Sequence, residues 1–371
     1  MTRSPTLTEA PDPARLRAEP ATDDPLGGVG SAIDALLAAF VPARVAELRA
    51  LDPALGPLGD ELAAFVASGK RLRPAFVYWG HRAAGADHDE GVWHVAAGVE
   101  LLHAFALVHD DVMDRGDERR GRPTVHRALA GQHDAEALEG DRDWFGIGGA
   151  VLAGDLLFVW ADRLLDETPM DAAALDRARR VFSDLRVEVM AGQYLDLRLA
   201  DLPAADQDDA LRVALLKSGR YTVTRPLQLG AALAGSHEGL DAALEAYGDA
   251  VGVAFQLRDD LLGVFGDPDV TGKGVADDLR EGKRTLLVLR ALEQADPRDR
   301  DRLAAGLGDP DLDEEGAAEL RRIIADSGAR DAVEQLVQQR RERAHAAVAS
   351  VSEPARTALA ALAERAVCRD R

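Results

Sequence analysis

Two groups of aspartates, far apart in the chain, are the residues whose types and spacing point most directly to chemistry. Asp110, Asp111 and Asp114 occur in LVHDDVMD, and Asp259 and Asp260 occur in FQLRDD. Asp110 and Asp114 are four residues apart, so on a helix they share one face. The first group falls near the C-terminal end of a predicted helix, where the helix dipole disfavours carboxylates.

If both groups face one cavity, their charges repel and raise each other's pKa unless cations lie between them. Oxygen ligands on rigid helices suit Mg²⁺, which keeps several waters and shares carboxylates with substrate phosphates. We therefore predict a Mg²⁺ site between the two groups. For one such group alone, a solvated acidic helix end is the simpler alternative.

Basic residues gather in short motifs although the chain as a whole is strongly acidic, with a formal net charge of −21. They follow the first aspartates and occur in GKRLRP, KSG, TGKG and EGKRT, as Arg119, Arg120, Lys70, Arg71, Arg73, Lys217, Lys273 and Lys283. Any one of them alone is typical of a solvated surface. Together, arginine forks and lysine point charges beside two acid groups are what is needed to hold diphosphates.

Composition sets outer limits on function. An acidic surface repels nucleic acid and anionic lipid, so we expect no nucleic-acid partner. The single cysteine, Cys368, excludes a disulfide framework and fits a reducing compartment, so we expect a cytoplasmic protein. The N-terminal residues contain no apolar signal-peptide core and no uncharged run reaches membrane-spanning length, so we expect no transmembrane segment.

From Ser31 onward the residue pattern is helical almost throughout, without alternating strands. The expected helices cover 31–50, 58–67, 70–85, 92–115, 147–166, 171–199, 209–234, 239–265 and 283–294, with shorter ones beyond 310. Two of these contain segments that are apolar nearly all round, 92–108 and 249–257, which predicts burial on most sides. Each leads directly into a group of aspartates.

The ends of the chain and one internal stretch differ from this pattern. Residues 1–28 hold five prolines and few apolar residues, so we expect a disordered tail before a single all-α domain over 29–371. The polar stretch 131–143 is expected to be an exposed loop.

Ordered motifs make the chain resemble the trans-isoprenyl diphosphate synthases of the polyprenyl synthetase family over about residues 31–350. The matching segments are GKRLRP, HAFALVHDDVMD, RRGRPTVH, LAGDLLF, GQYLDL, KSGRYT, GVAFQLRDD, FGDPDVTGKG and DDLREGKRT. The resemblance implies an all-α fold in which a single large helical bundle surrounds a central cavity, usually as a homodimer. It also implies Mg²⁺-dependent condensation of isopentenyl diphosphate with an allylic diphosphate.

By motif position, the resemblance also implies roles for individual residues. Three Mg²⁺ ions would be held with the allylic diphosphate by Asp110, Asp114 and Asp259, and the ligand set is completed by Asp111 and Asp260. The allylic diphosphate itself would be held by Arg119, Lys217 and Lys273, with nearby groups oriented by Gln256. Isopentenyl diphosphate would be held by Lys70, Arg73, His103 and Arg120, and Lys283 would lie near both diphosphates.

Product length should depend on what blocks the cavity below the first aspartates. Helical side chains lean toward the N-terminus, so the candidates precede Asp110 by four, five and eight residues, namely Ala106, Phe105 and Leu102. Ala106 is small and leaves the level beneath Asp110 open, whereas Phe105 is bulky, although an ordinary core position is the alternative for Phe105. An aromatic residue five before the first aspartate, with no insertion in DDxxD, resembles the makers of geranylgeranyl diphosphate. We predict that product first and farnesyl diphosphate second.

One position departs from the family pattern. The second acid group is usually DDxxD, whereas here Gly263 stands at the last position. Two interpretations remain open: an active enzyme whose second metal position relies mainly on Asp259, or a catalytically silent subunit that regulates an active partner. A third, an acidic helical scaffold, does not account for the basic residues around both acid groups.

Overall fold

The computed structural model describes residue 16 and residues 19–202, 204–266 and 277–367. Within these ranges all elements are helical except two strands of two residues each, β1 (Glu118–Arg119) and β2 (Arg122–Pro123), which pair in antiparallel fashion. The all-α fold expected from the sequence is confirmed.

The helices follow one another with short connections. The N-terminal part contains α2 (Gly27–Leu51), the short η1 (Pro53–Leu55), α3 (Gly56–Val66), α4 (Leu72–Ala83), α5 (Gly91–Met113), α6 (Val125–Ala135), α7 (Arg142–Asp166) and α8 (Ala172–Asp201). The C-terminal part contains α9 (Gln207–Val213), η2 (Ala214–Thr224), α10 (Arg225–Ala234), α11 (Glu238–Phe265), α13 (Asp277–Arg280), α14 (Leu286–Gln294), α15 (Pro297–Gly306), α16 (Glu314–Asp326), α17 (Ala329–Ala347) and α18 (Ala355–Val367).

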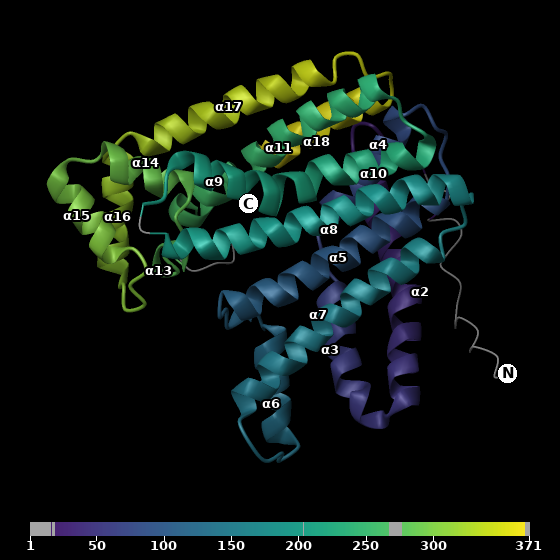
Figure 1. The fold of residues 1–371 in the computed structure, drawn as a ribbon, viewed down its shortest axis with the longest axis horizontal. Helices are drawn as coiled ribbons and strands as arrows, with labels where there is room; N and C mark the ends of the chain where they lie inside the picture. The colour runs from purple at the N-terminus through teal and green to yellow at the C-terminus, as the bar shows by residue number, and fades with distance from the viewer. Residues whose placement is uncertain (1–15, 17–18, 203, 267–276, 368–371) are drawn as a thin grey trace.

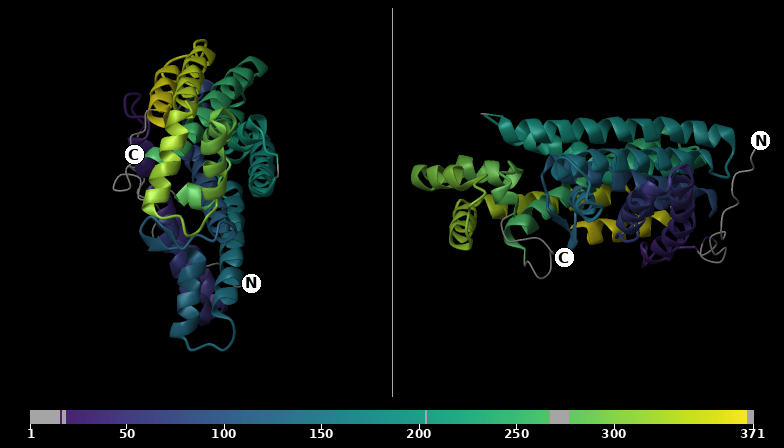
Figure 2. Two further views of the ribbon diagram at one scale, coloured as in Figure 1. Left: turned by 90° about the vertical axis from the view of Figure 1, so that its left-hand side faces the viewer. Right: turned by 90° about the horizontal axis from the view of Figure 1, so that it is seen from below.

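Long helices form the body of an elongated bundle (Figures 1 and 2). α5 packs along α7, while α11 packs against η2 on one side and α17 on another. The short helices α14, α15 and α16 gather at one end of the bundle (Figure 1). The two helices that carry the aspartates, α5 and α11, are therefore enclosed by neighbours, as their all-round apolar sequences predict.

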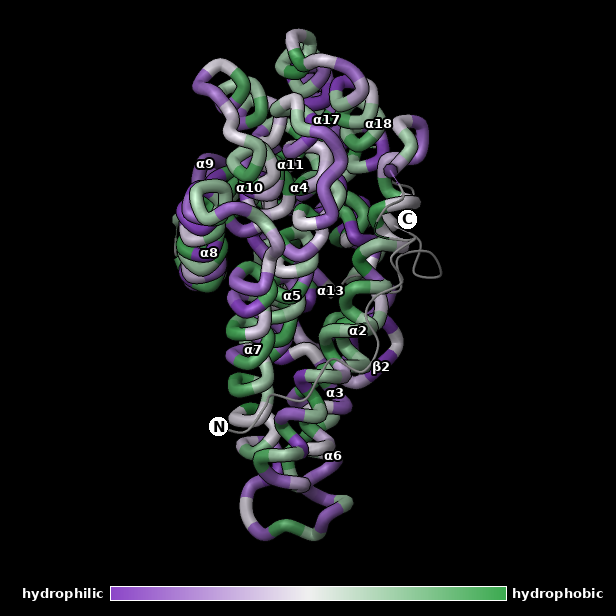
Figure 3. Tube along the Cα trace, turned by 90° about the vertical axis from the view of Figure 1, so that its right-hand side faces the viewer, coloured by the Kyte–Doolittle hydropathy of each residue, from purple (hydrophilic) through white to green (hydrophobic). Residues whose placement is uncertain are grey.

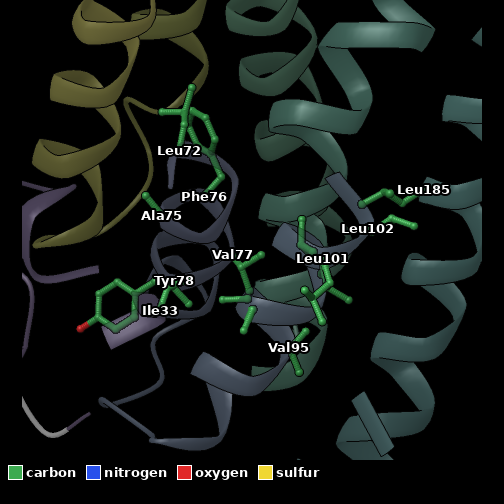
Figure 4. Packing of buried hydrophobic residues seen from close by; sticks show 14 of the residues in the cluster. Ile33, Leu72, Ala75, Phe76, Val77, Tyr78, Val95, Leu101, Leu102 and Leu185 are labelled. Carbon is green, nitrogen blue, oxygen red and sulfur yellow. The ribbon is translucent and has the colours of Figure 1, made fainter. Parts of the chain in front are cut away.

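α5 lies in the larger of two hydrophobic cores. Leu101 and Leu102 of α5 pack with Val77 of α4 and Leu185 of α8, all fully buried (Figure 4). The one buried acid in this part of α5, Glu100, is paired with Arg71 at 2.8 Å. A buried charge is tolerated where it has such a partner.

Part of the expected disordered tail is ordered in the structure. Leu16 is buried, and its carbonyl oxygen accepts a hydrogen bond from the indole of Trp93 at 2.8 Å. The Pro25 carbonyl accepts from the indole of Trp79 at 3.1 Å, and α2 already begins at Gly27. Proline and short apolar residues gave no periodic signal, but buried indole N–H groups need acceptors, and this segment supplies them.

Two other expected boundaries differ from the observed ones. Residues 209–234 were expected to form one helix but form α9, η2 and α10, of which η2 is a π-helix. The first part of the expected polar loop 131–143 belongs to α6, whose exposed face is polar. In both places the residue types favour helix, and the difference lies in hydrogen-bond spacing and length.

Three helices, α2, α5 and α7, are long and apolar enough to cross a membrane by length and composition alone. By this measure the expectation of no such segment does not hold. In α5, 78% of the most apolar window is buried inside the protein, whereas in α7 only 39% is. Hydrophobic positions recur along α7 (Figure 3), so this helix carries an apolar face that the described residues leave uncovered.

Glycines allow α4 and α10 to cross in close contact. A Cβ atom added to Gly230 would overlap the carbonyl oxygen of Val77 and lie 2.8 Å from the backbone nitrogen of His81. The backbones of the two helices therefore touch where no side chain fits between them.

We expect Gly230→Ala to lower the free energy of unfolding by about 1–3 kcal/mol, because the added methyl group forces the two backbones apart. Urea denaturation followed by circular dichroism measures this change. Gly131→Ala, in the exposed part of α6 where an added Cβ meets nothing within 4 Å, is the matched control and should be neutral or stabilising. Equal stability losses in the two variants would contradict the close-contact explanation.

Candidate active site

A cavity of about 990 Å³ opens where α5, α8, η2 and α11 converge with the segment before α4. Asp110 of α5 and Asp259 of α11 both line it, although they are far apart in the chain. The structure therefore brings the two acid groups to one shared hollow. Of the other expected site residues, the lining includes Lys70, Arg73, His103, Phe105, Ala106, Arg119, Arg120, Lys217, Gln256, Asp260 and Lys283.

The three carboxylates of the first acid group have different surroundings. Asp110 lines the cavity, with one carboxylate oxygen 3.1 Å from the ammonium of Lys217. Asp111 is buried behind the wall and accepts hydrogen bonds of 2.6–2.9 Å from Nε and Nη2 of Arg119. Burial, and then the neighbouring Asp110, raise the pKa of Asp114 to about 6. Asp111 thus fixes an arginine at the cavity, and the other two carboxylates are held close together at a cost in repulsion.

Lys217 is held by an acid that sequence reasoning did not single out. Its ammonium lies 2.6 Å from Asp196 of α8, within the motif GQYLDL. Burial lowers the pKa of Lys217, but Asp110 and Asp196 outweigh burial and raise it above its ordinary value. The signal for Asp196 was its place three residues after Gln193 in a motif already matched to the family.

Backbone geometry brings these two groups together. Lys217 stands in the π-helix η2, a form that occurs frequently at functional sites. A Cβ atom on Gly192 would overlap the backbone nitrogen of Lys217, so glycine lets α8 approach η2 closely enough for Asp196 to reach the lysine.

The second acid group contains a more deeply buried carboxyl. Asp260 is only 7% exposed, and its Oδ1 accepts a hydrogen bond of 2.7 Å from Nε2 of Gln256. Burial raises the pKa of Asp260 to about 8 despite that hydrogen bond, and the charges of Asp278 and Asp259 act in the same direction. Gln256 therefore orients Asp260, and the carboxyl binds a proton at neutral pH unless a cation comes near.

Lys283 lies between the two acid groups. Its ammonium is 4.0 Å from Asp114, 3.4 Å from Asp278 and 2.5 Å from Glu281. Burial lowers its pKa, but Asp278 and Glu281 outweigh that effect and raise it. Lys273, expected nearby, lies outside the described residues.

A separate basic surface lies at the start of α4. The guanidinium of Arg73 stacks on the ring of Tyr221 at 4.4 Å and donates a hydrogen bond of 2.9 Å to Thr222. The Nδ1 atom of His103 is 2.5 Å from the Tyr221 hydroxyl. Burial, and then Arg73 and Arg120, hold the pKa of His103 well below its usual range, so the imidazole is neutral. Lys70 and Arg120 line the same region.

The apolar end of the cavity is formed by part of the expected set. Phe105 and Ala106 line it, but Leu102 does not: it is fully buried in the core beside Leu185 (Figure 4). Leu102 lies about one helix turn before Phe105, farther from Asp110, and packs toward Leu185 of α8.

Phe105 itself is supported by other rings. Its ring centroid lies 4.7 Å from that of His109 and 5.1 Å from that of Phe158 on α7. His109 also lines the cavity and its Nε2 donates to the Val151 carbonyl at 2.9 Å. Sequence reasoning missed His109, which directly precedes the first aspartate pair.

The residues fit Mg²⁺ shared with a phosphate ligand better than an ion held by protein alone. Within the described ranges, no three His, Cys, Asp or Glu side chains gather closely enough to hold an ion. Mg²⁺ is usually held by one or two carboxylates with waters and substrate phosphates, which two separated aspartate groups across a cavity can provide. Lys217 and Lys283 lie beside Asp110 and Asp114, so the space between the two groups already attracts positive charge.

A helical bundle with two aspartate groups facing one basic-rimmed cavity is the arrangement of an isoprenoid diphosphate synthase. The polyprenyl synthetase family profile matches residues 58–324, and the chain belongs to that family. The protein is a prenyltransferase.

Relatives of known activity differ in the product they are named for. A geranylfarnesyl diphosphate synthase of Aeropyrum pernix is 37% identical over 65% of this chain and 70% of its own length. A (2E,6E)-farnesyl diphosphate synthase of Mycobacterium tuberculosis is 39% identical over 64% of this chain and 60% of its own length. Membership of the family therefore gives the reaction class but does not give the length of the product.

A solved structure of the family matches nearly the whole fold. The geranylgeranyl pyrophosphate synthase of Corynebacterium glutamicum, complexed with isoprenyl diphosphate and magnesium, has a TM-score of 0.88 and 38% identity. The match covers 92% of this chain and 99% of that one.

We expect Asp110→Ala to lower kcat by at least about 100-fold, because it removes a carboxylate that would hold the Mg²⁺ needed to offset the charge on the diphosphate. Turnover with radiolabelled isopentenyl diphosphate measures the loss, and far-UV circular dichroism should show unchanged helicity. Asp117→Ala removes an exposed carboxylate in the following loop, outside the cavity, and should retain near-normal turnover. Near-normal turnover of Asp110→Ala would refute the role of Asp110.

Proposed function

We propose that this prenyltransferase is a Mg²⁺-dependent geranylgeranyl diphosphate synthase, which condenses isopentenyl diphosphate with dimethylallyl, geranyl and farnesyl diphosphates. The observation that carries the proposal is the cavity that Asp110 and Asp259 line together with Phe105. The magnesium and isoprenyl diphosphate named for the Corynebacterium glutamicum structure support the choice of metal and substrate class.

The allylic diphosphate fits the acid-and-lysine end of the cavity. Breaking its C–O bond separates an allylic cation from a diphosphate, and Mg²⁺ would supply the positive charge that offsets the leaving oxygens. Lys217 and Arg119, fixed by Asp196 and Asp111, add preorganised cationic donors at that end. No rearrangement of these side chains is needed when the charge develops.

Isopentenyl diphosphate fits the second basic surface. The buried Nε of Arg73 has no hydrogen-bond partner among the described residues, so a donor remains for an incoming phosphate. The neutral His103 adds a hydrogen-bonding group without repelling the arginines beside it. After the isopentenyl double bond attacks the cation, the proton is lost to the departing diphosphate, so no strongly basic side chain is required.

The apolar end of the cavity argues for an intermediate product length. Ala106 leaves space directly below Asp110, whereas Phe105 closes the next level and is held there by His109 and Phe158. Because the rings of His109 and Phe158 pack in edge contact with that of Phe105, they hold it in place when a chain grows against it.

Purified protein with Mg²⁺, radiolabelled isopentenyl diphosphate and each allylic primer should make geranylgeranyl diphosphate as its main product. Phe105→Ala should shift the products to longer chains, because the ring that stops elongation is removed. Phe65→Ala, a partly buried phenylalanine outside the cavity lining, is the control and should leave the distribution unchanged. Chromatography of the dephosphorylated products measures chain length.

Two results would count against the proposal. No product with any primer would favour a catalytically silent subunit, the alternative that Gly263 suggests. Unchanged chain lengths in Phe105→Ala would remove this residue from the control of product length.

We also propose that the enzyme is a homodimer joined through α7 and α8. Large apolar side chains are exposed on both helices, including Leu152 at 60% and Val159 at 57% on α7, and Val187 at 64% on α8. An ion pair between Arg186 of α8 and Asp162 of α7, at 2.7 Å, joins the two helices. Large exposed apolar side chains on adjacent helices are typical of a surface that a second copy covers.

Val159→Glu should convert the dimer to a monomer, because it places a charge in the apolar contact. Size-exclusion chromatography with light scattering measures the mass. Leu51→Glu, equally drastic but at the exposed end of α2 where the side chain is 78% exposed, should leave the dimer intact. A wild-type monomer, or a Val159→Glu dimer of unchanged stability, would contradict this interface.

A further inference from the structure

The second acid group lacks a carboxylate at Gly263, but the space for that side chain is filled. A Cβ atom placed on Gly263 would overlap Oδ2 of Asp278 and lie 2.9 Å from its Cγ. Gly263 is near the end of α11, and Asp278 comes from α13, a separate helix. The carboxylate of Asp278 therefore stands where an acidic side chain at position 263 would begin.

We propose that Asp278 supplies the third carboxylate of the second acid group and helps to hold the Mg²⁺ that enters with the diphosphate. The proposal rests on the Mg²⁺ dependence proposed above. Asp278 lines the cavity together with Asp259 and Asp260, and its side chain is only 12% exposed. The glycine and the aspartate thus form one unit, in which loss of a side chain on α11 makes room for another from α13.

The position of Asp278 is fixed by the packing of its helix. Leu279 is fully buried, and its carbonyl accepts a hydrogen bond of 2.8 Å from the backbone of Gly308. Arg280 donates a hydrogen bond of 2.9 Å to the carbonyl of Leu312. The residues directly after Asp278 are therefore anchored to the segment between α15 and α16, which holds the carboxylate against Gly263.

Lys283 shows that this carboxylate and the first acid group face a common space. Its ammonium is 3.4 Å from Asp278 and 4.0 Å from Asp114, the C-cap of α5. A single positive charge thus touches acids from both sides of the cavity. The same place suits a divalent ion bridged to a diphosphate between the two groups.

The competing explanation is that Asp278 serves only as a counterion for Lys283. Glu281 provides a way to separate the two, because it also pairs with Lys283, at 2.5 Å, and is exposed. If pairing with Lys283 is what matters, removal of either acid should have similar consequences. If metal binding matters, only Asp278 should be needed.

The experiment titrates the full chain with Mn²⁺ as the probe, in the presence of inorganic pyrophosphate. Electron paramagnetic resonance measures the free Mn²⁺, and a titration without protein is the blank. Asp278→Asn should weaken pyrophosphate-dependent Mn²⁺ binding by about 10–100-fold. Glu281→Gln should leave it near the wild-type value. The double variant Gly263→Asp with Asp278→Gly, which returns the carboxylate from α11, should restore binding.

A metal-free measurement tests the shared space independently. Gly263→Asp alone should lower the Tm, because its side chain meets the carboxylate of Asp278, and addition of Asp278→Gly should recover the loss. Additive Tm changes in the double variant would overturn the inference that the two positions compete for one space.

Other outcomes of the metal titration would contradict the proposal in distinguishable ways. Wild-type binding in Asp278→Asn, or equal weakening in Asp278→Asn and Glu281→Gln, would overturn the role of Asp278 while leaving Mg²⁺ dependence in place. No pyrophosphate-dependent Mn²⁺ binding by the wild type would instead overturn the proposed Mg²⁺ dependence and this inference with it.

Discussion

The repulsion between carboxylates at the ends of two buried helices is the constraint on which the rest of the structure depends. Asp110 of α5 and Asp259 and Asp260 of α11 line one cavity, and Asp114 caps the end of α5 beside it. Burial and neighbouring carboxylates raise the pKa of Asp114 and of Asp260. Lysines from η2 and from the segment after α13 offset that charge, and each is tied to a further acid of its own. The active centre is therefore a network of paired charges around a gap that a metal diphosphate can complete.

Sequence alone predicted the fold and most of the charged residues that line the cavity, because both depend on local patterns. The all-round apolar character of 92–108 and 249–257 indicates two buried helices, each of which leads into a group of aspartates. The basic motifs were recognisable because they run against the net charge of the chain. These features need no knowledge of how distant segments pack.

Contacts between helices could not be predicted from the sequence. Leu102 turns into the core and Phe105 into the cavity, although both precede Asp110 on the same helix, because neighbouring helices decide which face is open. Asp196 and His109 depend on close approaches by α8 and α7 that no periodicity records. The relation between Gly263 and Asp278 likewise exists only in three dimensions, since nothing in the spacing of the two residues suggests that one fills the place of the other.

The contacts of the N-terminal segment bear on where the folding unit begins. Trp79 and Trp93, in the middle of the larger core, each give their indole hydrogen to a carbonyl that precedes α2. A truncated chain that started at α2 would leave both donors without these acceptors inside the protein. An unmet buried donor costs about 1–3 kcal/mol. The described residues before α2 are thus a structural part of the enzyme, and their removal would affect the core around Trp79 and Trp93.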